Sequence, residues 1–577
     1  MKNLTKTLFF VLWFFTQNLL AQQSAAHDIK YKALKSNMKT TITSNGRKIV
    51  FFENELTITS EIGRMELSLN RISFFGQPSQ FRLVKAYSVT DQQVFPVKSQ
   101  EISFSRVQNE KYGLTDLMQA EIPMSHLKVG SLVYYSYEIL GDNTQTGFAE
   151  EVVTMTNQTL AKEEIYQFYS KKPIKSAFFN ADNFFSYTEG KKNNFYFIEI
   201  RPTLMAYQAI GKQISTATLL MSTAPSWEAI NKKLAPNYEK IAASVLPLEF
   251  KVVAKQAKSL TSAQAQIEFI SREISKLITY SGDWRTDQKK IFPQTFNSLL
   301  MTRKGDCKDY ASVMTAILRD IGFTAYPALI MKSPSYIGES KMQLMSKVPA
   351  QSMFNHALVW AKDGAGREWW VDPTNPFVFA ETLSSDILGN YALVLDNQRK
   401  NIQFLPDKNL TAADSTIDQT LIISADNMVQ SSGKIGFTES SYLSLAQIEK
   451  LAGSAGVNKI LAYSINPQAK IDVYSKKSGD TRVPDYNFSY MSKNIVVEKE
   501  KGLRQVVQPH PAQLILMTQR RNEDSYIGEI GEFKLLTTVK NVNSPDELKS
   551  DCYVQSPWVS VERYVENKGK DLLITDY

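Results

Sequence analysis

Polar and apolar positions alternate along much of the chain between about residues 40 and 215, which predicts β-strands there. Residues 55–59 and 65–69 place apolar side chains at every second position, as strands with one buried face do. Residues 132–139 and 195–200 are rich in aromatic and β-branched side chains, which fit a pleated surface. Short strands separated by turn-forming residues are typical of a β-sandwich.

The pattern changes after Pro225, where apolar residues begin to recur at helical spacing. Ser226 stands where a helix N-cap is expected, directly before an apolar-periodic run. In residues 261–277 one face of the predicted helix is aliphatic, and Thr261 and Gln264 are spaced as a capping box. The middle of the chain is therefore expected to contain helices as well as strands.

Strand-like runs return in the last third of the chain, at 421–423 and 533–539. One helix is expected to interrupt them between about residues 440 and 462, with a weak point at the glycines of 453–456. The final residues, 572–577, read as a further strand.

These patterns and the chain length together predict an α+β multidomain protein. A chain of 577 residues is too long for a single hydrophobic core. The expected order is a signal peptide at 1–21, an N-terminal β-sandwich at 40–215, a central α+β core at 225–400 and a mainly β C-terminal domain at 401–577.

The first residues have the pattern of a secretory signal peptide. A basic start with Lys2 and Lys6 is followed by the apolar run 8–15, and 19–21 offers a cleavage site before Gln22. The apolar run is short for a membrane span, although an uncleaved anchor is the alternative. No cysteine stands directly after the run, so a lipoprotein is not indicated, and no later stretch reads as transmembrane. We therefore expect a periplasmic or secreted protein.

The charge pattern does not favour nucleic-acid binding. The apolar fraction of 43% and charged fraction of 21% are ordinary for a folded protein. The formal net charge of +8 is small for this length, and basic residues occur as scattered pairs, such as Lys289-Lys290. A basic stripe interleaved with aromatic residues is missing from the sequence, so solvated surface is the better interpretation.

Cys307 is one of only two cysteines, and it stands at a well-marked helix start. Asp306 is suited to cap the helix, with Asp309 at its third position, and Gly322 is suited to end it. The free N–H groups and the dipole of a first helical turn stabilise a thiolate. The alternative is a structural disulfide with Cys552, which an oxidising compartment would permit.

A histidine and an aspartate follow on a predicted hairpin. The turn-forming run 363–366 lies midway between His356 and Asp372, with Gly364 at the centre. A hairpin centred there would place the two side chains directly opposite each other on one face. Asp372 would then hold the tautomer and orientation of the imidazole.

The remaining histidines, His27, His126 and His510, are interpreted as structural. Two cysteines and four histidines without ligand pairs at zinc spacing do not indicate a metal site, and no cofactor is expected.

The middle region resembles the transglutaminase-like superfamily, a branch of the papain-like cysteine enzymes. The matching phrases are Tyr280 with its preceding helix, KGDCKD at 304–309, LRDIGFTAYP at 318–327, NHA at 355–357 and VDPT at 371–374. In that superfamily the cysteine is the nucleophile, the histidine its base and acid, and the aspartate the orienting residue. The resemblance carries these roles to Cys307, His356 and Asp372, and it implies a papain-like fold.

The flanks resemble exported bacterial proteins that carry an uncharacterised N-terminal β domain before such a core. The matching phrases are at 85–88, 112–116, 128–131 and 388–395. This architecture implies no particular substrate. For the oxyanion, the Cys307 N–H is the expected donor, with Tyr280 and Trp284 as side-chain candidates. The loop 332–352 is expected to border the cleft.

Two functions follow from these features. The first is thioester-mediated hydrolysis or acyl transfer on a protein or peptide substrate, with Cys307 attacking an amide carbonyl. The alternative is a catalytically silent module that binds envelope proteins or glycans, because a fold alone does not prove activity.

Overall fold

The computed structural model describes most of the chain from Lys30 to Asp576. The described residues are 30–44, 46–109, 113–143, 146–156, 163–179, 185–202, 216–281, 291–332, 344–375, 380, 382–384, 387–405, 415–465, 471–476, 483–493, 496–498, 504–506, 533–540, 552–555 and 560–576. The predicted signal peptide, His27, Trp284 and His510 lie outside them. The first of two compact units comprises the described residues up to Thr374 together with Asn390–Phe404, and the second comprises the remaining described residues.

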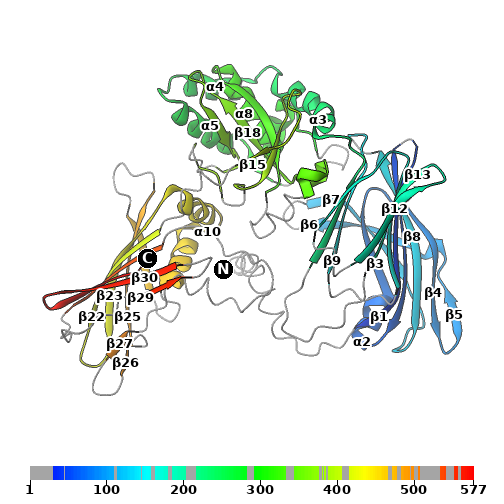
Figure 1. Cartoon of the computed structure of the whole chain (residues 1–577), viewed down its shortest axis with the longest axis horizontal. Coiled ribbons are helices and arrows are strands. Elements are labelled where there is room, and N and C mark those ends of the chain that lie inside the picture. The colour runs from blue at the N-terminus through cyan, green and yellow to red at the C-terminus, as the bar shows by residue number, and fades with distance from the viewer. Residues whose placement is uncertain are drawn as a thin grey trace. The chain divides into compact units, whose positions relative to one another are not determined.

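The first unit begins with a long sheet of eight strands (Figure 1). Its spatial order is β12 (Phe185–Lys192), β13 (Phe195–Pro202), β10 (Glu163–Ser170), β1 (Tyr31–Ile42), β2 (Arg47–Ile58), β8 (Leu132–Asn143), β4 (Phe81–Thr90) and β5 (Gln93–Pro96). Most neighbours are antiparallel, whereas β1 and β10 run parallel.

Two small sheets pack on this long sheet and complete a β-sandwich. They are β11 (Lys175–Phe179), β14 (Thr216–Ser222) and β9 (Glu150–Thr156), and β3 (Leu69–Phe75), β7 (Gly113–Pro123) and β6 (Ser103–Asn109). Phe168, Ile200 and Leu219 belong to the buried cluster under the first small sheet. A second cluster, with Ile122 and Val133, lies under the other. The predicted sandwich is confirmed.

Residues 65–69 were expected to form a strand, and that prediction is wrong. They fall almost wholly in helix α2 (Glu61–Ser68), and only Leu69 starts a strand. A side-chain cap stabilises the start of this helix, because the Ser60 hydroxyl accepts the Gly63 N–H at 3.1 Å. A cap of this kind satisfies a donor that the helix itself leaves open, so it outweighs a short alternating pattern.

The central region combines helices with a five-stranded antiparallel sheet. The sheet order is β19 (Glu368–Val371), β18 (His356–Lys362), β17 (Thr324–Ile330), β20 (Tyr391–Val394) and β21 (Gln403–Phe404). The helices are α3 (Trp227–Ala242), α4 (Leu248–Lys258), α5 (Ala263–Leu277), α7 (Phe296–Thr302) and α8 (Cys307–Asp320), with the short parallel pair β15 (Thr279–Tyr280) and β16 (Lys304–Gly305).

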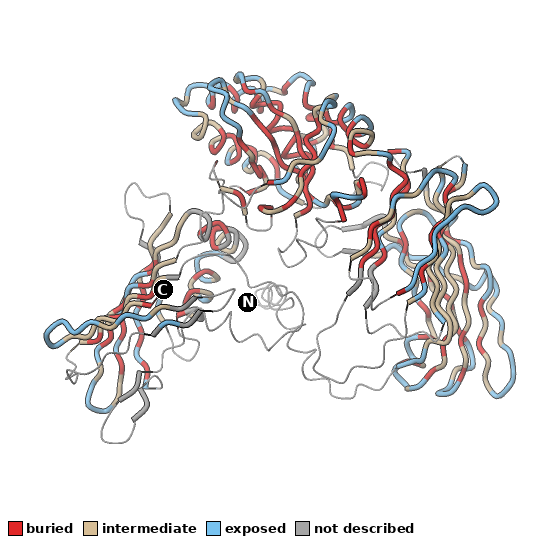
Figure 2. Tube along the Cα trace, in the orientation of Figure 1, coloured by how far each residue is buried: buried red, intermediate tan, exposed pale blue. Residues whose placement is uncertain are grey.

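Helix α8 is the innermost element of this region (Figure 1). It packs on β17 and β18 and also contacts α3, α4 and α5, and every residue from Lys308 to Leu318 is buried (Figure 2). The predicted starts of α3 and α5 agree with the structure to within one residue. Ser226 caps α3 as expected, whereas α5 is capped by Ser262 rather than by Thr261.

The second unit contains another eight-stranded sheet. Its order is β24 (Ile471–Lys476), β25 (Asp485–Ser492), β23 (Val429–Phe437), β22 (Ser415–Ile423), β28 (Phe533–Lys540), β31 (Asp571–Asp576), β30 (Ser560–Lys568) and β29 (Cys552–Gln555), and β26 (Val496–Glu498) pairs with β27 (Arg504–Val506) separately. Helix α10 (Glu439–Ile465) is broken at Gly453, whose φ is 67°, as the sequence indicated. Across the described ranges, no helix is both long and apolar enough to cross a membrane.

Candidate active site

Cys307 is the first residue of α8, and the helix start is held by reciprocal aspartate bonds. Asp306 is the N-cap in extended conformation, and its N–H donates to Oδ2 of Asp309 at 3.0 Å. The other oxygen of Asp309 accepts the N–H of Gln294 at 2.7 Å. The predicted helix start is confirmed. Cys307 carries a free thiol and is partly exposed, which leaves it accessible to reagents.

Asn355 fixes the backbone beside His356. His356 opens β18 and pairs with Ile330 of β17. Just beyond that pair, the Asn355 amide Nδ2 donates to the Lys332 carbonyl and its Oδ1 accepts the Lys332 N–H, each at 2.6 Å. The side chain thus acts as one more step of the β-ladder, which holds His356 against the end of β17.

The hairpin after His356 forms, but its predicted register is wrong. Lys362 pairs with Glu368, so the hairpin is centred on residue 365 instead of 364. The cause is a five-residue loop, in which Asp363 accepts the N–H groups of Ala365 and Arg367. The register places Asp372 opposite position 358, two residues from His356. A shift of two keeps both side chains on the same face, within diagonal reach.

The structure brings His356 and Asp372 into direct contact. Nε2 of His356 lies 2.9 Å from Oδ2 of Asp372, and both residues are buried. Oδ1 of Asp372 accepts the Thr374 N–H at 3.1 Å and the Thr374 hydroxyl at 2.7 Å. Nζ of Lys332 stands 3.5 Å from Oδ2. The carboxylate is therefore oriented by three residues, and its charge faces the imidazole.

The charges at the site favour an imidazolium beside a carboxylate. Burial lowers the pKa of His356, but the charge and hydrogen bond of Asp372, together with Cys307, outweigh burial and raise it. Burial raises the pKa of Asp372, but His356, Lys332 and Thr374 together hold it well below its usual range. The contribution of Cys307 to this rise indicates that its thiol lies within electrostatic reach of the imidazole.

Tyr280 lies on the short strand that pairs beside Gly305, close to the thiol in the fold. It pairs with Gly305, two residues before Cys307, and the Ser281 N–H donates to the Gly305 carbonyl at 2.8 Å. The residue is 45% exposed, and its ring meets the Tyr310 ring edge-on, with centroids 5.8 Å apart. The other oxyanion candidate, Trp284, and residues 333–343 of the predicted loop lie outside the described residues.

The sequence alone assigns no role to Lys332 or to Thr374. Thr374 had a usable signal, because Asp-Pro-Thr is a turn pattern in which the aspartate accepts the N–H two residues later. Lys332 had none, since its distance from Asp372 is set by the pairing of β17 with β18 and of β18 with β19. In the described part of the chain, no group of three or more His, Cys, Asp or Glu residues is placed to hold a metal ion.

Comparison with known protein families supports the resemblance predicted for the central region. Residues 250–371 match the family model of the transglutaminase-like superfamily, and this segment of the chain is a transglutaminase-like domain. No curated protein matches the sequence. The resemblance of the central region to that superfamily is thereby confirmed.

Among solved structures, a "putative protease" from Parabacteroides distasonis ATCC 8503 superposes with a TM-score of 0.60 at 11% identity, covering 95% of this chain and 93% of that one. At this identity the likeness shows the fold alone. A "putative cysteine protease" from Cytophaga hutchinsonii gives 0.15 at 11% identity, covering 46% and 86% of the two chains. Red sea bream transglutaminase gives 0.18 at 8% identity, covering 95% and 87%. The last two TM-scores are too low to indicate a shared fold.

Proposed function

We propose that this chain is an exported thiol enzyme that cleaves or transfers amide bonds through a thioester on Cys307. The observation that carries the proposal is the buried contact of His356 with Asp372, in which the imidazole lies within electrostatic reach of the Cys307 thiol. Nucleophile, base and orienting acid are linked in this order in cysteine and serine acyl-transfer enzymes. The proposed architecture is a β-sandwich at 40–215, the core at 225–400 and a β domain at 401–577, after a signal peptide at 1–21.

The proposed first half-reaction begins with a proton transfer. With the Nε2–H of His356 donated to Asp372, Nδ1 is the ring atom that takes the proton of the Cys307 thiol. The thiolate attacks the carbonyl carbon of an amide, and the N–H groups of the first turn of α8 stabilise the oxyanion. The imidazolium then donates its proton to the leaving amine, which departs as the C–N bond breaks and the thioester remains.

The second half-reaction decides between hydrolysis and transfer. Neutral His356 removes a proton from water or from an acceptor amine, which attacks the thioester and regenerates the thiol. A protein or peptide is the proposed substrate, because an amide bond flanked by side chains suits a partly exposed thiol beside an exposed aromatic such as Tyr280. The description of the Parabacteroides distasonis protein as a "putative protease" points the same way.

Selective alkylation tests the proposal. The full chain is treated with limiting iodoacetamide near neutral pH, and labelling of Cys307 and Cys552 is followed by peptide mass spectrometry. Cys307 is expected to react at least about tenfold faster than in the His356→Ala variant, because a thiolate attacks and a thiol does not. Rates that are equal in the two proteins would contradict an activated nucleophile and leave a binding module as the better description.

Activity is then sought with peptide and glutamine-containing acyl donors, with and without an added amine. Cys307→Ser is the control, since it removes the thiol and keeps the helix start. Export is tested separately by sequencing the N-terminus of the protein recovered from the periplasm or medium, where a start at Gln22 is expected.

A further inference from the structure

Glu150, far from the core in sequence, contacts the turn that leads to His356. It is the first residue of β9, in the small sheet of the β-sandwich. Its Oε1 accepts the Gln351 N–H at 2.9 Å, and its Oε2 accepts the Ser352 N–H at 2.7 Å. These two residues open a single 3₁₀ turn, Gln351–Met353. Both partners of the contact lie in the same compact unit.

The chain between this turn and His356 is fixed at each step. The Phe354 N–H donates to the Gln351 carbonyl at 2.9 Å, and the Phe354 ring packs on Trp227 at 5.3 Å between centroids. The Asn355 N–H donates to the Ile330 carbonyl at 3.2 Å. Because hydrogen bonds or ring packing fix this short segment, we expect a displacement of the turn to be passed on to the imidazole.

A carboxylate that receives two backbone N–H groups makes strong, charge-assisted bonds with defined direction. Burial raises the pKa of Glu150, although the N–H groups of Ser352 and Gln351 and the charge of Lys48 act the other way. The carboxylate is thus partly buried where it holds a turn of the neighbouring core.

We propose that Glu150 is a positioning residue for His356, through which the N-terminal β-sandwich sets the geometry of the candidate active site. The proposal rests on the role of His356 as the base of the proposed function. It gives the sandwich a part in the reaction itself. The core and the sandwich would then act as one unit.

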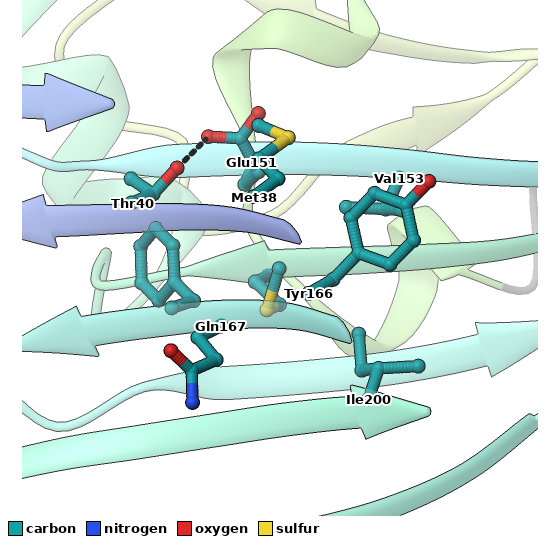
Figure 3. Close-up of a pocket in the computed structure, with 9 residues that line it drawn as sticks. Met38, Thr40, Glu151, Val153, Tyr166, Gln167 and Ile200 are labelled. Carbon is teal, nitrogen blue, oxygen red and sulfur yellow. Dashed lines mark hydrogen bonds between the residues drawn. The ribbon is translucent and has the colours of Figure 1, made fainter. Parts of the chain in front are cut away.

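Glu151 provides a matched control on the same strand. It faces the other way, into a small pocket of the sandwich, where the Thr40 hydroxyl donates to its carboxylate at 3.3 Å (Figure 3). Its second partner is Lys48, with Nζ at 2.5 Å. The pocket, which Met38 and Tyr166 also line, has room for about one water molecule. Glu151 therefore shares the strand and charge of Glu150 without its contact to the turn.

The test compares Glu150→Gln, Glu150→Asp and Glu150→Ala with Glu151→Gln in the full chain. The rate of Cys307 alkylation is measured across pH for each, with thermal unfolding to follow overall stability. Glu150→Ala is expected to slow alkylation about tenfold, because a displacement of about 1 Å is enough for such a loss. Glu150→Gln keeps the side-chain length and one acceptor oxygen. It is expected to fold, and its alkylation rate is expected to lie between those of the wild type and Glu150→Ala. Glu151→Gln is expected to match the wild type.

The decisive measurement is a double-mutant cycle with His356→Ala. If Glu150 acts through His356, Glu150→Ala has no further effect once the imidazole is gone. An undiminished effect in that background, or a wild-type rate and pH profile in Glu150→Ala, overturns the inference alone. Equal rates in wild type and His356→Ala overturn the proposed function, and this inference with it.

Discussion

Replacing Asp372 by asparagine is expected to move the reactivity of Cys307 to higher pH. The substitution keeps the size of the side chain and an oxygen that accepts the His356 Nε2–H. In the wild type, Nε2 lies 2.9 Å from Oδ2 of Asp372. It removes the charge that stabilises the imidazolium. The pKa of His356 therefore falls, and the thiolate–imidazolium pair forms only at a higher pH than in the wild type.

The magnitude follows from the buried contact. A hydrogen bond to a charged group contributes about 1.5–3 kcal/mol, and burial of both partners keeps solvent from screening it. At about 1.4 kcal/mol for each pKa unit, the loss corresponds to a shift of about one to two units. At a fixed pH below the new midpoint, alkylation of Cys307 is expected to slow by about ten- to a hundredfold.

The assay is the second-order rate of iodoacetamide alkylation, measured between about pH 4 and pH 9. Asp363→Asn serves as the control, because it makes the same chemical change in the loop of the same hairpin. It weakens the hairpin without touching the imidazole. A profile for Asp372→Asn that superposes on the wild type, while Asp363→Asn shifts it, would refute the assigned role of Asp372.

Three further predictions concern neighbouring groups. Lys332→Met is expected to shift the alkylation midpoint the opposite way, down by roughly 0.5 pH unit, because it removes a cation that competes with the imidazolium for Oδ2 of Asp372; the same pH series measures it. The free energy of unfolding is expected to fall below about pH 4, since the depressed pKa of Asp372 gives stability that is lost as the carboxylate is protonated. Denaturant titrations should show a slope from this group of at most about 1.4 kcal/mol per pH unit, and Asp372→Asn should remove it. Gly322→Ala is expected to cost about 1 kcal/mol of unfolding free energy and to leave alkylation by iodoacetamide unchanged, since Gly322 holds a φ of 104° after α8.

The helix start at Cys307 could be predicted because its signals are local. Asp306 and Asp309 act within one turn, so the residues that decide the cap stand side by side in the sequence. For His356 and Asp372, the sequence predicts that the two side chains share one face of the hairpin, but it does not fix which residues lie opposite each other. Side-chain alternation fixes which residues share a face, whereas the register depends on loop geometry at Asp363.

What the sequence did not reveal depends on distant contacts. Lys332 reaches Asp372 only because β18 pairs with both β17 and β19, and Glu150 meets Gln351 across about two hundred residues of chain. In the sequence both are ordinary charged residues that read as surface. The short alternating run at 65–69 misled for a related reason, since a single serine cap before it decided the outcome.

The burial of α8 on every side determines the smallest piece of the chain that can keep this site. The segment that matches the family model, 250–371, stops one residue before Asp372 and leaves out α3 and β20. Arg319 of α8 makes a bidentate pair with Glu239 of α3, at 2.8 and 2.9 Å. A shortened protein cut at the limits of the match would expose one side of its central helix and one edge of β17. Such a fragment is expected to aggregate, so the part of the protein that is recognisable in sequence is smaller than the part that is physically self-sufficient.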